Sequence, residues 1–283
     1  MWFGKAPAPP PPSPPAIDIS VLDVRYLLAL YAVHAAVYLL LRLLMGDRKD
    51  PKKQSSAAAI VTYNLTGFCY ACFTTFIGLT AWFGGEVDEI AGTAHGRLYG
   101  YSASFETIMY ATAAYEAYNT VLTIFMPEYR TADFVGHHAT TFVLALSGGY
   151  PFLNYYGVFF MGVASVSSIP LCLAEVAECF EAAEKRGVVL QLRSLFALLF
   201  LLVRTLYWPY VSGCFWLDCV AVLGGGTPGL EAHSPAVYGL FLVANTGLTA
   251  LQLLWTGKIL RGIADAVNGV SQSQSVGRGG KKE

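Results

Sequence analysis

Charged residues are scarce in this chain. Asp, Glu, Lys and Arg make up only 13% of its 283 residues, whereas 55% are hydrophobic. An average soluble domain is about 25% charged, so the composition excludes an ordinary soluble enzyme. The formal net charge of −1 also argues against a nucleic-acid partner, which would leave a basic surface. The composition therefore indicates a membrane protein, and its few polar groups become the guide to its function.

Several catalytic motifs are missing as well. The chain has no phosphate-binding loop of the GxxxxGK[ST] type, no GxSxG nucleophile motif and no HExxH zinc motif. It has 5 histidines and one adjacent pair, too few for the histidine-rich ligand set of membrane di-iron oxygenases. We therefore predict no bound metal and no cofactor.

Long apolar segments make up most of the chain, and a membrane-spanning helix needs about 20 mostly apolar residues. Seven such segments cover residues 22–45, 57–84, 101–126, 134–150, 152–177, 194–217 and 235–257. The fourth is the shortest. We predict an all-α fold, a polytopic membrane helix bundle of about seven transmembrane helices. Six spans with a re-entrant segment are the alternative.

Lysine and arginine are concentrated in alternate connections, which in membrane proteins face the cytosol. They are Arg48, Lys49, Lys52 and Lys53 in the first connection, Arg130 in the third, Lys185, Arg186 and Arg193 in the fifth, and Lys258, Arg261, Arg278, Lys281 and Lys282 towards the C-terminus. This distribution predicts a lumenal or external N-terminus and a cytosolic C-terminus.

The two ends of the chain have the composition of unstructured tails, rich in proline at the start and in Gly, Ser, Gln and Lys at the end. We predict a Pro-rich disordered tail over residues 1–21 and a flexible tail over 263–283. Between them we place a first transmembrane helix with its basic loop, 22–54, and one membrane domain, 55–262.

A pair of adjacent histidines, His137-His138, opens the fourth apolar segment. Ionisable groups at membrane depth are costly and persist mostly where they line a cavity or carry out chemistry. Asp133 lies one helical turn before His137 and is predicted to orient its ring. Adjacent residues of a helix point about 100° apart, so one ring is predicted to face a cavity and the other to pack between helices. The alternative is that both rings only hydrogen-bond to buried carbonyls.

Other polar residues fall at similar depths in other segments. An unpaired buried charge is very costly, so Glu116 and Arg204, both well inside their segments, are predicted to pair. The remaining candidates for a polar site or a lipid cavity are Tyr115, Asn119, Ser167, Ser168 and Gln252.

Four stretches, in this order, carry a resemblance to a known family. They are Tyr115-Glu116-Ala117-Tyr118-Asn119, the paired-histidine segment from Asp133 to Thr141, the F-x-x-x-R-x-x-x-x-P helix from Phe200 to Pro209, and the L-x-x-x-W-x-x-x-I-L helix from Leu251 to Leu260. With these the chain resembles the TLC family, named for translocating-chain-associating, longevity-assurance (ceramide synthase) and neuronal-lipofuscinosis proteins. The resemblance implies a six-helix TLC core preceded by an N-terminal helix, and the endoplasmic reticulum as the family's usual location.

The resemblance also implies what the site does. In ceramide synthases the paired histidines are thought to serve acyl transfer from acyl-CoA to a sphingoid amine. This chain departs from that pattern: Asn119 replaces the usual Asp, and the acidic extension of the synthases is absent between His138 and Phe180. We therefore expect a membrane protein that binds, senses or traffics lipid. One alternative is a lipid N-acyltransferase with His137 or His138 as its catalytic residue and acyl-CoA as co-substrate, and another is an accessory subunit of a larger membrane complex.

Overall fold

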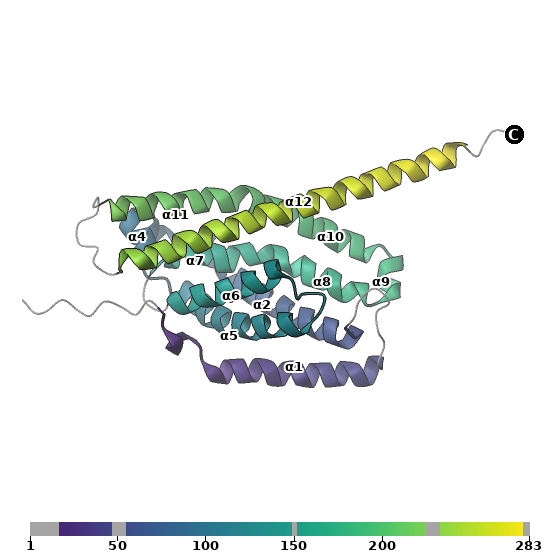
Figure 1. Cartoon of the computed structure of the whole chain (residues 1–283), viewed down its shortest axis with the longest axis horizontal. Helices are drawn as coiled ribbons and strands as arrows, with labels where there is room; N and C mark the ends of the chain where they lie inside the picture. The colour runs from purple at the N-terminus through teal and green to yellow at the C-terminus, as the bar shows by residue number, and fades with distance from the viewer. Residues whose placement is uncertain (1–16, 47–54, 149–151, 225–232, 280–283) are drawn as a thin grey trace, which may run out of the picture.

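The computed structural model describes residues 17–46, 55–148, 152–224 and 233–279, which form helices joined by short connections. Seven helical rods lie side by side in one elongated bundle (Figure 1). They are α1 (Val24–Met45), α2 (Ala57–Phe83), α5 (Ala103–Phe125), α6 (Ala132–Ser147), the broken rod α7 to α8 (Asn154–Glu178), the continuous rod α10 to α11 (Val188–Leu223) and α12 (Pro235–Gly279).

Five of these rods are long and apolar enough to cross a membrane by length and composition alone. They are α1, α2, the rods Asn154–Glu178 and Val188–Leu223, and α12 over Pro235–Asp265. The helices α5 and α6 pack against each other and complete the seven. With 16 residues, α6 is shorter than the roughly 20 residues of a full span, in keeping with the short fourth apolar segment. The predicted all-α membrane bundle is confirmed.

Side chains of the local sequence set where several helices begin. Asp23, Ser56 and Ser102 each accept a backbone N–H of the first turn of α1, α2 and α5. These caps satisfy donors that a helix start otherwise leaves without a partner.

The connections contain four short helical segments that hydropathy did not predict. They are η1 (Ile19–Val21), α3 (Asp88–Ala91), α4 (Ala94–Tyr99) and α9 (Glu181–Lys185). The segment η1 corrects the predicted boundary of the N-terminal tail. Asp18 donates its backbone N–H to the carbonyl of Leu146, and Val21 is only 2% exposed. Residues 1–16 of that tail lie outside the described residues.

The helix α12 is longer than predicted and continues beyond the rest of the bundle (Figure 1). A flexible tail was predicted from residue 263, but the backbone is helical through Gly279. Adding residues to a helix that already exists avoids the unfavourable nucleation step, so a polar sequence can extend it.

Polar contacts between connections show which of them share an end of the bundle. Glu128 accepts hydrogen bonds from Ser55, and Asp133 accepts one from Lys258. Arg193 pairs with Glu175 and Glu178. We call this end, formed by residues 55, 126–133, 175–193 and 255–259, the basic end. The first, third and fifth connections therefore lie at the same end as the segment after Lys258, which is the grouping that the charge pattern predicts.

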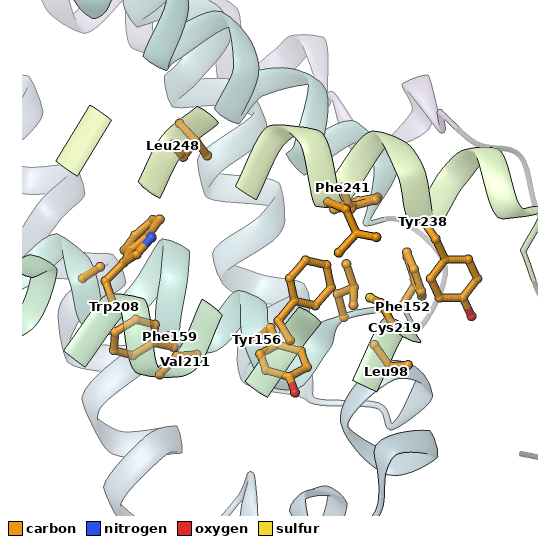
Figure 2. Close-up of a cluster of buried hydrophobic side chains, with 14 of the residues drawn as sticks. Leu98, Phe152, Tyr156, Phe159, Trp208, Val211, Cys219, Tyr238, Phe241 and Leu248 are labelled. Atoms are coloured by element: carbon orange, nitrogen blue, oxygen red, sulfur yellow. The ribbon is translucent and has the colours of Figure 1, made fainter. Parts of the chain in front are cut away.

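The main hydrophobic cluster extends from the middle of the bundle to the opposite end. Figure 2 shows side chains of α4, of the 152–159 segment, of α11 and of α12 packed together. The labelled members are Leu98, Phe152, Tyr156, Phe159, Trp208, Val211, Cys219, Tyr238, Phe241 and Leu248.

Close packing elsewhere in the bundle depends on glycine. A Cβ on Gly78 would lie 2.6 Å from the Cα of Gly162. The backbones of α2 and of the 158–162 segment therefore touch, as small residues allow in membrane bundles.

Candidate functional site

An internal cavity of about 530 Å³ runs along the bundle. Its lining changes in character from one end to the other. Glu175, Arg193 and Lys258 line it at the basic end, and Phe152, Phe215 and Phe241 belong to the hydrophobic cluster at the opposite end. Lys258 and Phe241 lie on α12 about 25 Å apart, at about 1.5 Å per residue. The cavity thus has a polar end and an apolar end, and its length is a large part of the roughly 30 Å hydrocarbon thickness of a bilayer.

Two irregular helical segments contact each other beside the middle of the cavity. In the fifth rod, a π-helical segment, η2 (Val158–Gly162), and a 3₁₀ segment, η3 (Val163–Ser167), precede Pro170. In the sixth, the π-helical segment η4 (Phe200–Tyr207) precedes Pro209. Proline lacks the N–H that continues the helical ladder, which accounts for a break just before it. The segments η3 and η4 contribute Ser167 and Arg204, and π-helical turns often occur at functional sites.

Glu116 pairs with His138, and the predicted contact between Glu116 and Arg204 is wrong. The Nδ1 atom of His138 lies 2.7 Å from Oε2 of Glu116, and both residues line the cavity. The reason is helix packing: α5 lies against α6, which brings the carboxylate to the histidine pair. With Glu116 ionised, its carboxylate can only accept, so Nδ1 of His138 is then the donor of this hydrogen bond.

The amide nitrogen of Asn119 lies close to both ring nitrogens of His138, at 3.0 Å from Nδ1 and 3.2 Å from Nε2, and so sits over the ring. The same amide nitrogen donates to the hydroxyl of Tyr115 at 3.2 Å. The carbonyl oxygen of Asn119 is buried and has no hydrogen-bond partner in the described part of the chain. The Glu116–His138–Asn119 cluster is therefore well connected but leaves one acceptor open.

His137 lines the same cavity but lacks such partners. Its ring packs edge-on against Trp255 at a centroid distance of 5.4 Å, and its Nδ1 atom is buried with no hydrogen bond to the residues described. The expectation that one ring faces the cavity and the other packs away is thus only half met, because both histidines line the cavity. A buried nitrogen without a partner is costly, and a polar ligand or a water would satisfy it.

Asp133 does not orient His137 as predicted. Its Oδ2 atom accepts hydrogen bonds from Nε1 of Trp255 at 3.1 Å and from Nζ of Lys258 at 2.8 Å. The helices α6 and α12 are thereby joined at the basic end. The aspartate acts on His137 through Trp255, whose ring it holds in place.

Arg204 is held by neutral groups. Its Nε atom donates to the carbonyl of Ala164 at 3.2 Å and to the hydroxyl of Ser167 at 2.9 Å. Its Nη1 atom donates to Oε1 of Gln252 at 3.4 Å. Within the described residues it forms no ion pair, although it lines the cavity.

Eight of the ten predicted site residues line the cavity, and the other two contact residues that do. The eight are Tyr115, Glu116, Asn119, His137, His138, Ser167, Ser168 and Arg204. Asp133 accepts a hydrogen bond from Trp255, and Gln252 accepts one from Arg204. Hydropathy alone did not single out Tyr63, Tyr70, Glu175 or Arg193, which also line it. Arg193 and Glu175 could have been found from the sequence, because each is an ionisable residue at the edge of an apolar segment.

A bundle of apolar helices around a cavity with one polar end defines the class, a multi-pass membrane protein with an internal site. The TLC domain matches residues 62–261, which is more than half of the chain. The protein belongs to the TLC family. The match nearly coincides with the predicted membrane domain, 55–262. None of the curated protein sequences compared with the chain matches it.

Proposed function

We propose that this protein binds a membrane lipid in its internal cavity and serves in lipid sensing or traffic. The observation that carries the proposal is the cavity itself, polar near the histidine pair and apolar among Phe152, Phe215 and Phe241. An amphiphile needs this combination, since its head keeps hydrogen bonds while its chain stays out of water. The volume of about 530 Å³ falls in the range of about 300–1,000 Å³ that holds one small molecule.

The orientation belongs to the same proposal. With the basic end in the cytosol, the N-terminus is lumenal and the C-terminus cytosolic. The cavity then receives lipid near the cytosolic leaflet. The endoplasmic reticulum is the proposed location, on the family resemblance alone. Association with other membrane subunits stays a prediction.

The experiment fills the cavity and follows the lipid. Leu248 lines the apolar part and is 9% exposed, whereas Val243 on the same helix is 74% exposed and does not line the cavity. Leu248→Trp should expel the lipid that copurifies with the protein, and Val243→Trp should leave it unchanged. Lipid per protein is measured by extraction and mass spectrometry. Equal lipid content in the wild type and the Leu248→Trp variant would contradict the proposal.

The hydrogen bond between Glu116 and His138 favours a second candidate, acyl transfer. A carboxylate that holds the protonated nitrogen of a histidine leaves the other nitrogen free to take a proton from an amine. Here the amide nitrogen of Asn119 sits over the ring of His138, at 3.0 Å from Nδ1 and 3.2 Å from Nε2, and restricts the approach of an amine to that ring. We therefore favour binding over base catalysis.

One assay separates the two candidates. Purified protein is incubated with acyl-CoA and a long-chain base, and the N-acyl product is measured. For a binding protein we expect no product from the wild type. Product that disappears in His138→Ala would replace binding by acyl transfer as the function.

A further inference from the structure

Arg204 is a cavity-lining charge with free hydrogen-bonding capacity. A guanidinium has five N–H donors in a planar fork, and only Nε and Nη1 are used here. The Nη2 atom makes no hydrogen bond to any described residue, nor is it among the buried atoms that lack one. Since Arg204 lines the cavity, the unused side of the fork is accessible from inside the bundle.

The groups behind Arg204 position it without neutralising it. Ala164, Ser167 and Gln252 all offer neutral acceptors, and Glu116 is engaged by His138 at 2.7 Å. Gln252 is fully buried, at 0% exposure, and its Nε2 atom is a further donor without a partner in the described chain. Two donor groups of fixed position, one of them charged, thus remain open beside each other.

This arrangement selects for negative charge. A planar fork of N–H donors matches a carboxylate or a phosphate and binds either through two parallel hydrogen bonds. Such bonds are stronger in a site of low dielectric constant than in water. An acidic head group would give Arg204 a charged hydrogen-bond partner, whereas its present hydrogen-bond partners are all neutral.

The depth of Arg204 sets where the ligand's chain lies. Gln252 is one helical turn from Trp255, against which His137 packs, so Arg204 lies just beyond the histidine pair as seen from the basic end. Past it the lining is apolar, with Phe160, Trp208 and Leu248. Phe215 lies about 16 Å further along the same rod, at about 1.5 Å per residue. That distance accommodates most of one extended acyl chain.

We propose that Arg204, supported by Ser167 and Gln252, is the binding subsite for the acidic group of a single-chain amphiphile, either the carboxylate of a fatty acid or the phosphate of a lysophospholipid. The inference rests on the proposed lipid-binding function and specifies its ligand. The chain of this amphiphile fills the apolar end, and its acidic group is within reach of the histidine pair.

The test compares ligands that share a chain and differ in charge. Binding of oleic acid, 1-oleoyl lysophosphatidic acid and oleyl alcohol to the full-length protein in neutral detergent is measured at pH 8.5. The wild type should bind at least one of the two acids about tenfold more tightly than the alcohol, as expected for a charge-assisted pair of hydrogen bonds. The preferred acid tells whether the group is a carboxylate or a phosphate.

Variants assign the preference to Arg204. Arg204→Gln should abolish the preference for the acid and leave the affinity for the alcohol within about twofold, because only the charged contact is lost. Gln252→Leu, which keeps the arginine but loosens its support, should reduce the preference in part. Arg261→Gln is the control: it removes a positive charge from an exposed position of α12 that does not line the cavity.

The outcomes of this test distinguish the acidic subsite from lipid binding in general. If the wild type binds acid and alcohol equally, or if Arg204→Gln weakens both equally, the acidic subsite is refuted while lipid binding stands. If neither acids nor alcohol bind, the proposed function fails and the subsite with it. Should Arg204→Gln not fold, the wild-type comparison and Gln252→Leu still give the answer.

Discussion

Arg97 and Arg204 show two ways in which this bundle treats a positive charge. Arg97, on α4 at the end opposite the basic end, meets Asp218 through two hydrogen bonds of 2.6 and 2.7 Å. Tyr156 donates a further hydrogen bond to the same carboxylate. Arg204, in the middle of the bundle, has only neutral partners, and polar atoms without partners lie near it. Arg97 is thus paired within the fold, whereas Arg204 keeps N–H donors free to bind a ligand.

The difference separates structural polar groups from those available to a ligand. Burying a hydrogen-bonding atom without a partner costs roughly 1–3 kcal/mol, and a stable fold normally avoids this. The buried atoms that lack partners here include Nδ1 of His137, Oδ1 of Asn119 and Nε2 of Gln252. These three lie in one region, around the histidine pair and Arg204, whereas Oγ1 of Thr75 and Oδ1 of Asn245 lie elsewhere in the bundle. Such an arrangement is expected of a site that is complete only with its ligand.

The largest effect should come from opening the paired cluster. Asp218→Asn removes the charge that Arg97 and Tyr156 share, and we expect a loss of about 3 kcal/mol in unfolding free energy, because a partly buried charge loses its partner. Thermal unfolding in detergent measures it. Val220→Ala on the lipid-facing side of α11, where Val220 is 57% exposed, is the control. An unchanged unfolding temperature in Asp218→Asn would show that this cluster is not structural.

The two adjacent histidines should differ in how much stability is lost on the same substitution. His138→Phe leaves the carboxylate of Glu116 buried without its 2.7 Å partner, so we expect a loss of about 2 kcal/mol. His137→Phe removes a nitrogen that has no partner in the described residues, so stability should change by less than about 1 kcal/mol. Lipid retention should fall in both variants. Equal destabilisation by both substitutions would contradict the difference between a bonded and an unbonded ring.

Much of this fold could be predicted from the sequence because hydropathy and loop charge are local properties. The runs of apolar residues located the seven rods, and Lys and Arg grouped the connections at their ends. Residues four apart share a face of a helix, and the structure shows the hydrogen bond between Asn119 and Tyr115, one turn before it.

The partners across helices could not be predicted in this way. Opposite charges suggested that Glu116 pairs with Arg204. The packing of α5 against α6 instead places the carboxylate of Glu116 next to His138. The spacing of Asp133 and His137 predicted a contact along one helix, whereas Lys258 and Trp255 reach Asp133 from α12. Pro170 and Pro209 were visible in the sequence, yet the π-helical and 3₁₀ turns before them depend on the fit between the rods.

A smaller effect is expected at the basic end. Lys258 is 58% exposed in its side chain, and its contact with Asp133 at 2.8 Å is an exposed ion pair. Such pairs contribute about 0.2–1 kcal/mol and weaken with salt. Lys258→Met should therefore lower stability by less than about 1 kcal/mol, and high salt should remove the difference. A double-mutant cycle of Lys258→Met with Asp133→Asn measures the coupling energy of the pair. A coupling energy above 2 kcal/mol would mean that this pair contributes to stability as much as the pair of Arg97 and Asp218.

The smallest effect concerns Glu86, which joins the connection after α2 to the start of α5. Its carboxylate accepts hydrogen bonds from the hydroxyl of Ser102 at 2.7 Å and from the backbone N–H of Ser104 at 3.1 Å. Partial burial raises the pKa of Glu86, but the hydrogen bonds from Ser104 and Ser102 outweigh it and hold the pKa below the ordinary value of 4.5. Like the carboxylate of Asp218, this group is fully engaged within the fold.

A lowered pKa sets the direction of the pH dependence. The folded protein releases this proton more readily than the unfolded chain, so the stabilisation is present above pH 4.5 and is lost as the pH falls through the lower folded value. Glu86→Gln should therefore lower the unfolding temperature slightly at pH 7 and flatten its decline below pH 4.5. Glu89→Gln, at an exposed position of α3, should keep the wild-type decline. If Glu86→Gln and Glu89→Gln have the same pH profile, the hydrogen bonds of Glu86 do not contribute to stability. Of the two charged groups discussed at this end of the bundle, only the pair of Arg97 and Asp218 would then be structural.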